Sequence, residues 1–415
     1  MNVSGEAGTR EARSAGGSGS NGAVRLDREL QAELDRMRTA GTLKAFRVLE
    51  SPQGPEVRLK GHGEVVVLSS NDYLGLANHP AVVEAGIEAL RRYGAGTASV
   101  RFICGLFEPH LALEADLAAF LGTESALTYV SCWNANHAVL DALCDERTHV
   151  FSDELNHASI IDAMRLARPG AKTVFPHSDM AGLEQALAGA GEVSRKLVVT
   201  DGVFSMEGDL ARLPELVELA RRHEAVLIVD DSHGLGVMGE TGRGTAEHFG
   251  LHGQVDIVTG TLGKALGGAA GGFIAGNRAL CSVLEQRSRP QLFSNGLPPT
   301  VAAGARQALR ELRDDPGLIG RLRSNTAEFR TRLEDAGIKP VAGESAIVPV
   351  IVGATAAAIA ISAEMLEAGV FVTGFGYPVV PEGTARVRAQ MSAALEPEHL
   401  ERAVAALGTA IARHG

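Results

Sequence analysis

Several features that define other protein classes are scarce in this sequence. Aromatic residues make up only 4% of the 415 positions, and the four cysteines form no CxxC pair, so neither a zinc knuckle nor a dithiol redox site is indicated. No apolar run approaches the roughly 20 residues that cross a bilayer, so we expect no membrane association. Basic residues number 39 against 50 acidic ones, a net charge of −11, whereas tight nucleic-acid binding needs a basic surface.

Glycine, in contrast, is abundant at 49 residues, and hydrophobic residues reach 45%. Many glycines with few aromatics suit a large α/β enzyme with tight turns, and do not suit a lectin-like β-sandwich. The start of the chain is rich in Gly and Ser and has no apolar secretory segment, so we predict a disordered tail over residues 1–23. Scattered cysteines and the missing secretory segment predict a cytoplasmic protein.

Hydrophobic periodicity divides the rest of the chain into three parts. Residues 24–69 contain a predicted helix at 25–40 and a strand at 64–68. The helix has one apolar face formed by Leu26, Leu30, Leu34 and Met37. Over residues 70–300, short β-branched strands alternate with helices, which is typical of a doubly wound, mostly parallel α/β sheet. The clearest strands are 196–200, 225–230, 255–260 and 271–275. Residues 301–415, which begin with one long helical stretch to residue 336, predict a smaller α+β domain.

Three motifs with reactive side chains follow predicted strands. Asp230 ends the strand AVLIVD, Lys264 lies in the glycine-rich segment TGTLGKALGG, and His157 lies in NHAS. Ligands of open α/β sheets bind at the carboxyl ends of strands. Each residue also has an ordinary interpretation, as a turn carboxylate, a solvated lysine or a capping histidine. The lysine segment lacks the GxxxxGK[ST] spacing of a phosphate-binding P-loop.

Together the three side chains match the needs of pyridoxal phosphate. A desolvated lysine amine forms an imine with the aldehyde of this cofactor, and a carboxylate keeps its pyridinium nitrogen protonated as an electron sink. An imidazole plane stacks on the ring, and small or hydroxyl residues surround the phosphate. The sequence offers such hydroxyls at Ser205, Thr261 and Ser294. We therefore predict an enzyme that uses pyridoxal phosphate and no metal.

At these residues the chain resembles the α-oxoamine synthases, which are fold-type-I enzymes dependent on pyridoxal phosphate. The resemblance extends from about Leu26 to the C-terminus. Its densest stretches are SNDYLGLANHP (70–80), GTASVRFICG (96–105), SDELNHASIID (152–162), TDGVFSMEGDLA (200–211), VDDSHGLG (229–236), TGTLGKALGGAAGG (259–272), QRSRPQLFSN (286–295) and ARVRAQMSAA (385–394). Within the family, the chain is most similar to the glycine C-acetyltransferase branch. The resemblance implies a large cofactor-binding α/β domain and a small C-terminal domain.

The resemblance implies catalytic roles for four residues. Lys264 would hold the cofactor covalently and later act as the base on the substrate α-proton. Asp230 would pair with the pyridinium nitrogen, and His233 would hydrogen bond the ring 3-hydroxyl oxygen. His157 would stack on the face of the ring.

Binding roles are implied for further residues. The phosphate would be held by Cys132, Trp133, Thr261 and nearby Ser205. Ser294 and Asn295 would reach a phosphate in the neighbouring subunit of a homodimer with shared active sites. Arg388 would clamp the amino-acid carboxylate, with Asn71 beside it, because a guanidinium matches a carboxylate bidentately.

The implied reaction condenses an amino acid with an acyl-CoA. The deprotonated α-carbon attacks the thioester and coenzyme A leaves, giving a β-keto acid or, after loss of CO2, an α-amino ketone. We expect glycine as the amino acid, because Val100 would crowd a larger substituent at the α-carbon, and acetyl-CoA as the first choice of acyl donor. The chain would thus be an acyltransferase of amino-acid metabolism.

Three alternatives stay open. An aminotransferase or threonine aldolase would share the fold and cofactor but would not explain the blocks at 96–105 and 286–295. A non-catalytic subunit would have no need of the site lysine. A specialised oxoamine synthase would take a larger amino acid, such as glutamate, serine or alanine, or another acyl thioester. His137 beside Asn134 favours this last alternative because it could bond a polar side chain, and Gly376 would leave room for one.

Overall fold

The structure is a computed structural model that describes residues 20–40, 42–44, 46–191 and 193–415. Most of the predicted tail, residues 1–19, lies outside the described residues. No helix in the described part of the chain is long and apolar enough to cross a membrane.

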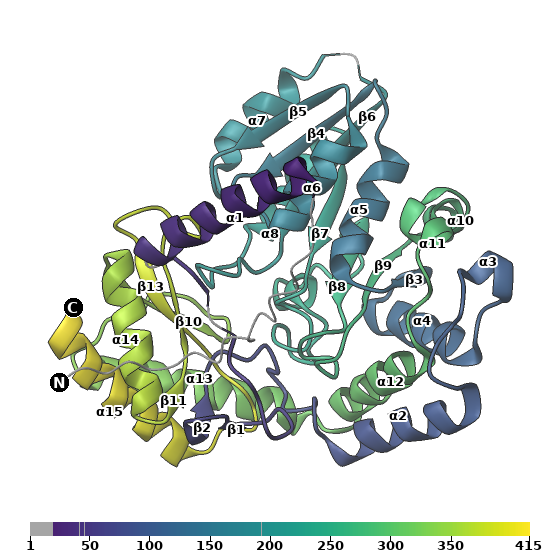
Figure 1. Cartoon of the computed structure of the whole chain (residues 1–415). Coiled ribbons are helices and arrows are strands. Elements are labelled where there is room, and N and C mark those ends of the chain that lie inside the picture. Colours follow the sequence, from purple (N-terminus) through teal and green to yellow (C-terminus); the bar gives the residue numbers. More distant parts are fainter. Residues whose placement is uncertain (1–19, 41, 45, 192) are drawn as a thin grey trace.

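The main sheet has seven strands in the order β3-β9-β8-β7-β6-β4-β5 (Figure 1). Their bounds are β3 (Ser125–Tyr129), β4 (Thr148–Asp153), β5 (Ala171–Phe175), β6 (Arg195–Asp201), β7 (Val226–Asp230), β8 (Ile257–Thr261) and β9 (Gly272–Gly276). Neighbouring strands pair in parallel, except that β9 is antiparallel to both β3 and β8. The four clearest strands lie within two residues of their predicted bounds, and the predicted mostly parallel α/β fold is confirmed.

Helices cover both faces of this sheet because each strand sends alternate side chains to opposite sides. Leu227 and Val229 of β7 pack in one hydrophobic cluster with residues of α4, α7, α8 and α12 (Pro299–Asp314). Ile228 packs on the opposite face with residues of α5, α6 and α10. The helices of this region are α2 (Pro80–Tyr93), α3 (Arg101–Cys104), α4 (Glu108–Leu121), α5 (Cys132–Leu143), α6 (Ala158–Ala167), α7 (Met180–Ala188), α8 (Leu213–Arg222), α9 (Thr245–His248), α10 (Arg278–Arg287) and α11 (Arg289–Phe293).

The predicted single helical stretch from 301 to 336 is wrong in one respect. The structure has two helices there, α12 (Pro299–Asp314) and α13 (Gly317–Asp335). Pro316 separates them, because a proline disfavours helical backbone at the residue before it. Residues of α12 pack on α2 and α4 of the large sheet region. The boundary at residue 300 stays a prediction.

The C-terminal region forms a second, antiparallel sheet in the order β10-β13-β12, flanked by helices. Its elements are β10 (Ile347–Gly353), α14 (Thr355–Glu367), β11 (Val370–Phe371), β12 (Thr373–Phe375), β13 (Ala385–Gln390) and α15 (Pro397–His414). A third sheet joins the two ends of the chain. In it, β2 (Gly63–Val67) pairs with β1 (Glu56–Leu59) and with β11.

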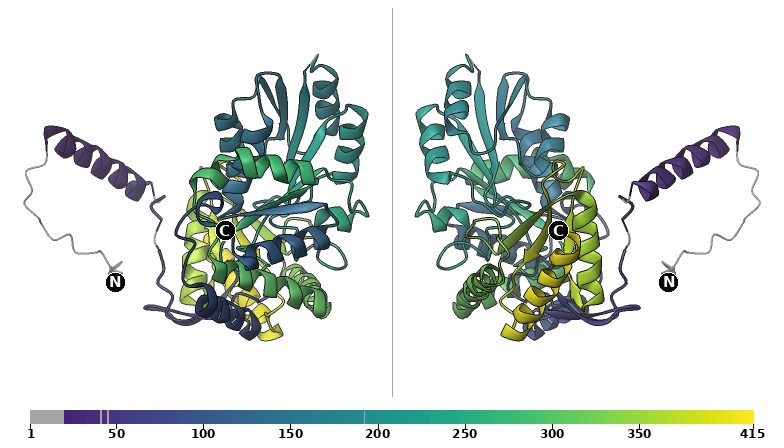
Figure 2. Two further views of the ribbon diagram at one scale, coloured as in Figure 1. Left: turned by 90° about the vertical axis from the view of Figure 1, so that its right-hand side faces the viewer. Right: turned by 90° about the vertical axis from the view of Figure 1, so that its left-hand side faces the viewer.

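The first helix, α1 (Asn21–Thr39), projects from the body of the molecule (Figure 2). It begins four residues before the predicted start, where the Ser20 side chain accepts a hydrogen bond from the backbone N–H of Ala23. None of its residues is buried, so the predicted apolar face lies open to solvent. Exposed apolar faces of this kind mark interaction surfaces.

Candidate active site

A cavity of about 240 Å³ lies at the carboxyl ends of β6, β7 and β8, where open α/β sheets bind their ligands. Its lining comes from five segments far apart in the sequence. Seven of the predicted site residues line it: Cys132, Trp133, His157, Asp230, His233, Thr261 and Lys264. The structure therefore brings together the four residues predicted to be catalytic.

The N-terminus of α5 opens onto this cavity. Ser131 caps the helix by accepting a hydrogen bond from the backbone N–H of Asn134 at 3.2 Å. A Cβ on Gly272 of β9 would overlap the backbone of Cys132, so only glycine lets β9 approach the start of α5 this closely. A helix N-terminus with free backbone N–H groups is a natural site for a phosphate.

Lys264 lies between β8 and β9, with its amine inside the cavity. Its Nζ lies 2.9 Å from Nε2 of His233. Burial lowers the pKa of the Lys264 amine, although the nearby Asp230 opposes this effect. A lysine with a lowered pKa is more often neutral, and a neutral amine is the form that attacks an aldehyde or accepts a proton.

The protonation of His233 is set by two residues that the sequence analysis did not single out, Tyr73 and Gln390. The Tyr73 hydroxyl donates its proton to Oε1 of Gln390 at 2.8 Å. The Tyr73 hydroxyl oxygen is therefore left to accept from Nδ1–H of His233 at 2.8 Å. Nε2 of His233 is then the unprotonated nitrogen that faces Lys264. Burial, with the neighbouring Lys264, lowers the pKa of His233 well below its usual value, so the ring is neutral.

Asp230 and His157 are joined through Asn136, which is 2% exposed and which the sequence analysis also missed. The Asn136 amide donates to Oδ2 of Asp230 at 2.6 Å and to the Ser159 hydroxyl at 2.8 Å. The Ser159 hydroxyl lies 2.8 Å from Nδ1 of His157 and orients that ring. Thr259 donates to Oδ1 of Asn136 at 2.7 Å, so the amide cannot rotate without losing all three contacts.

A second buried carboxylate, Asp201, lines the cavity at the end of β6. Its Oδ2 accepts from the backbone N–H of His157 at 3.2 Å, while its Oδ1 is buried without a hydrogen-bond partner. Burial, and then the charge of Asp230, raises the pKa of Asp201 well above its usual value. Two buried carboxylates and one orphaned oxygen suit a cavity that receives a cationic, hydrogen-bonding ring.

These features fit pyridoxal phosphate. The lysine amine would meet its aldehyde, Asp230 its pyridinium nitrogen, and the N-terminus of α5 its phosphate. The described part of the chain holds no cluster of three or more His, Cys, Asp or Glu side chains placed to bind a metal.

The predicted carboxylate-binding residues lie outside the 240 Å³ cavity. Arg388 of β13 donates to the backbone oxygen of Ser205 at 2.7 Å and lies over the ring of Phe375, 4.6 Å from its centroid. Its Nε is buried without a partner, as is Oδ1 of Asn71. An unpaired buried donor is costly, so the Nε–H of Arg388 is suited to a carboxylate ligand, which accepts. Asn71 could bind the same carboxylate only through its amide NH2, because its Oδ1 is an acceptor.

Three predicted phosphate-binding residues are not in the cavity either. Ser205 contacts Arg388 through its backbone oxygen. Ser294 and Asn295 follow α11 and do not line the cavity in a single chain. Their roles stay predictions.

The residues that favoured a larger amino acid take other positions. His137 does not line the cavity. The Asn134 side chain is already hydrogen bonded, because its Oδ1 accepts from the Ser131 hydroxyl at 2.7 Å. A Cβ on Gly376 would lie 2.5 Å from Thr355, so a neighbouring side chain already fills the space next to this glycine. These three residues therefore do not form a pocket for a polar side chain at the 240 Å³ cavity, whereas Trp133 does line it.

Comparisons with known proteins place these features in context. A profile of the aminotransferase class I and II family matches residues 63–407. The chain is 45% identical over 387 residues to mitochondrial 2-amino-3-ketobutyrate coenzyme A ligase from Bos taurus, covering 93% of this chain and 92% of the relative. It is also 45% identical over 386 residues to 8-amino-7-oxononanoate synthase from Geobacter sulfurreducens, covering 92% and 97%. A serine palmitoyltransferase structure with pyridoxal phosphate superimposes with a TM-score of 0.88 at 31% identity, covering 93% and 98%.

The predicted cytoplasmic location is contradicted by the same comparisons, because the mammalian relatives are named as mitochondrial proteins. Reduced, scattered cysteines and a missing secretory segment distinguish only oxidising, secreted proteins from the rest. They do not separate the cytosol from another reducing compartment.

Proposed function

Because this chain belongs to the aminotransferase class I and II family and, within it, to the α-oxoamine synthases, we propose that it is a pyridoxal-phosphate-dependent C-acyltransferase that condenses glycine with an acyl-CoA and releases coenzyme A. One observation supports this most directly: the buried Lys264 amine contacts His233 in the same cavity as Asp230. Of the three similar proteins, the two at 45% identity are named as a coenzyme A ligase and a synthase, which favours this activity over that of an aminotransferase.

Pyridoxal phosphate, when bound, supplies an aldehyde for an amine and a ring that withdraws electrons from the α-carbon of an amino acid. Lys264 would hold the cofactor and, once released by the incoming amino acid, take the α-proton at Nζ. Its pKa, lowered by burial, makes the neutral amine that accepts a proton more accessible. Asp230 would face the pyridinium nitrogen, kept in place by Asn136. His233, whose Nε2 is a free acceptor when Lys264 turns away, would bond the ring hydroxyl.

Arg388 and Asn71 are proposed to bind the substrate carboxylate. The Arg388 guanidinium is oriented by the Ser205 backbone oxygen and by the Phe375 ring, and its Nε–H has no partner within the chain. A carboxylate that accepted this N–H and one terminal N–H would form the bidentate pair that arginine favours. Such a pair orients the α-carbon without contacting it.

Glycine is the proposed amino acid, and the steady-state kcat/KM for glycine, alanine, serine and glutamate with acetyl-CoA tests it. We expect glycine to be preferred by about tenfold or more, which corresponds to about 1.4 kcal/mol in the transition state. Val100 is buried at the start of α3, as expected for a side chain that limits space. If alanine, serine or glutamate exceeds glycine by that factor, the glycine assignment is wrong and the alternative with a larger substrate holds.

We propose further that the active enzyme is a homodimer with shared active sites. Three large apolar side chains on α3 and α11 are mostly exposed: Phe102 (67%), Ile103 (64%) and Phe293 (74%). The two helices are in contact with each other, and Ser294 and Asn295 directly follow Phe293. A second copy of the chain would cover this patch and place both polar residues near its cavity, because closed symmetric dimers bury such patches.

The double substitution Phe102→Asp with Phe293→Asp tests the dimer. We expect sedimentation velocity to show a monomer, with the loss of most acyltransferase activity, because a buried apolar contact cannot accept two unpaired charges. Val174→Asp is the matched control, since Val174 of β5 is 55% exposed and lies on the opposite edge strand of the sheet from β3. A double variant that sediments as the unaltered protein does would refute the assignment of this patch.

A further inference from the structure

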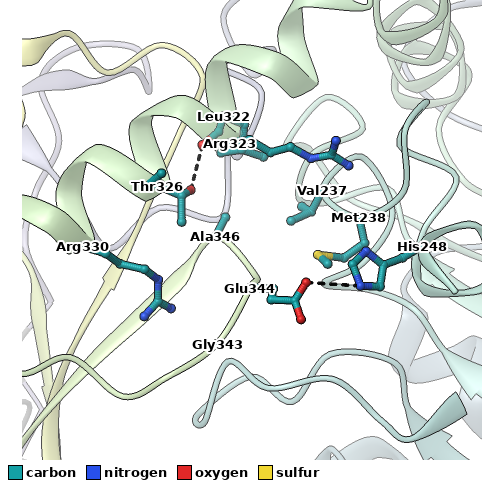
Figure 3. A pocket seen from close by; sticks show the side chains of 11 residues that line it. Val237, Met238, His248, Leu322, Arg323, Thr326, Arg330, Gly343, Glu344 and Ala346 are labelled. Carbon is teal, nitrogen blue, oxygen red and sulfur yellow. Dashed lines mark hydrogen bonds and ion pairs between the residues drawn. The ribbon is translucent and has the colours of Figure 1, made fainter.

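A second and larger cavity, of about 450 Å³, lies between α13 and the segment that follows β7 (Figure 3). Its walls are formed by α13, by residues 237–248 with α9, and by the chain just before β10. It shares no lining residue with the candidate active site. The proposed reaction therefore leaves this cavity without a role.

The walls of this cavity are largely apolar. Val237 and Met238 form one side, Leu322 of α13 the other, and Ala346 lies between them (Figure 3). Ala327, also on α13, is a further lining residue. A cavity of this size with an apolar lining and a few charged groups is typical of small-molecule sites.

The charges at the rim are unbalanced in favour of cations. Arg323 and Arg330 both extend from α13, and Glu344 is the one carboxylate among the lining residues. Oε2 of Glu344 lies 3.5 Å from Nε2 of His248. Because this carboxylate faces the histidine, neither guanidinium has an acidic partner in the lining. In the described part of the chain, neither arginine has a carboxylate within 4.0 Å of its nitrogens.

Arg330 is the more unusual of the two arginines. Its terminal nitrogens donate to the backbone oxygens of Val341 at 2.7 Å and Ile347 at 3.1 Å, and its Nε is buried with no partner. Burial lowers the pKa of the guanidinium, and only Glu334, one turn further along the same helix, opposes this. A partly buried cation without a counter-ion destabilises a folded protein unless a ligand supplies the opposite charge.

We propose that this cavity binds an aliphatic monocarboxylate, with its carboxylate toward Arg330 and Arg323 and its hydrocarbon chain along Val237, Met238 and Leu322. A guanidinium is the side chain best suited to a carboxylate, and the apolar walls gain free energy by burying a chain. Arg323 and Arg330 carry two positive charges and Glu344 carries one negative charge, so the net charge of these three side chains matches a monoanion. A polyanion such as phosphate would meet the Glu344 carboxylate and would leave the apolar walls uncovered.

Isothermal titration calorimetry of the cofactor-loaded enzyme with hexanoate, acetate and hexan-1-ol tests the proposal. We expect hexanoate to bind with a Kd of about 1 mM or tighter. Acetate keeps only the carboxylate and hexan-1-ol keeps only the hydrocarbon chain, so each should bind at least about tenfold more weakly than hexanoate. Acetate or hexan-1-ol binding as tightly as hexanoate would contradict the proposal, as would the absence of hexanoate binding.

Variants locate the site. Ala327→Phe fills the cavity and leaves its charged side chains unchanged. Arg323→Gln removes one positive charge and leaves the backbone contacts of Arg330 in place. Both variants should weaken hexanoate binding by about tenfold or more. Arg313→Gln, an exposed arginine on α12, is the control and should bind normally. Loss of binding in Arg388→Gln, with normal binding in Ala327→Phe, would place hexanoate at the active site and overturn the proposal. The acyltransferase activity of the unaltered enzyme does not depend on any of these outcomes.

Discussion

Replacing Lys264 by alanine is expected to reduce turnover by about 10⁴-fold or more, because the variant loses both the covalent link to the cofactor and the base for the α-proton. The variant should fold, since the lysine amine makes one hydrogen bond, to His233, and lies in a cavity. It should still bind pyridoxal phosphate, more weakly, through the remaining contacts. Steady-state kinetics and the cofactor absorbance of the purified variant measure the two effects.

A chemical test identifies the lysine independently of activity. Borohydride reduction of the unaltered enzyme followed by peptide mass spectrometry should find the cofactor on Lys264. Lys196→Ala is the matched control: this lysine lies on β6 and donates to the backbone oxygen of His223, away from the cavity, so its removal should leave activity and the labelled peptide unchanged. A reduced adduct on any lysine other than 264 would contradict the assignment.

Substituting asparagine for Asp230 is expected to lower kcat by about 10²–10³-fold or more, since breaking a buried charge pair costs about 3–5 kcal/mol. Asparagine has nearly the same shape, and its single amide oxygen can accept from Asn136 or from the backbone N–H of Ser232, but not from both. One hydrogen bond is lost, and we expect the fold to be kept. The lost charge should lower the pKa of the pyridinium nitrogen. A pH titration of the bound cofactor's absorbance reports that change directly.

Asp256→Asn is the control for this variant. Asp256 directly precedes β8, at the opposite end of the strands from the cavity, and accepts from the backbone N–H of Leu227. The Asp256→Asn variant should leave the cofactor spectrum unaltered, and the only expected change is in the free energy of unfolding. An Asp230→Asn enzyme with near-normal kcat and an unshifted titration would remove Asp230 from the proposed mechanism.

The sequence predicted the parts of the site that belong to single strands. Asp230 and Lys264 follow short apolar runs, and the rule that ligands bind at strand ends placed them together before any coordinates. Asn136 was missed because its role exists only across space: it binds Asp230, which is 94 residues away in the chain. Nothing in its local context distinguishes it from the polar residues around it on α5.

Tyr73 and Gln390 were missed for the same reason, since they meet each other across 317 residues. The break between α12 and α13 was different, because Pro316 was visible in the sequence and its effect on the preceding residue is local. For α1, periodicity predicted the helix and its apolar face but not that the face would be left uncovered. Periodicity describes which side of a helix is apolar and contains no information about its partner.

The antiparallel position of β9 limits the order in which the cofactor site is assembled. The edge strand β3 pairs only with β9 in the main sheet, so Ser125 has no strand partner until Gly276 has been synthesised. Until then, α5, which follows β3 and carries Cys132 and Asn136, is not anchored to the sheet through its own strand. Pairing between strands so distant in the chain forms late in folding, whereas N-terminal segments leave the ribosome first. A nascent chain can therefore contain Asp230, His157 and Lys264 and still have no complete pocket for a phosphate.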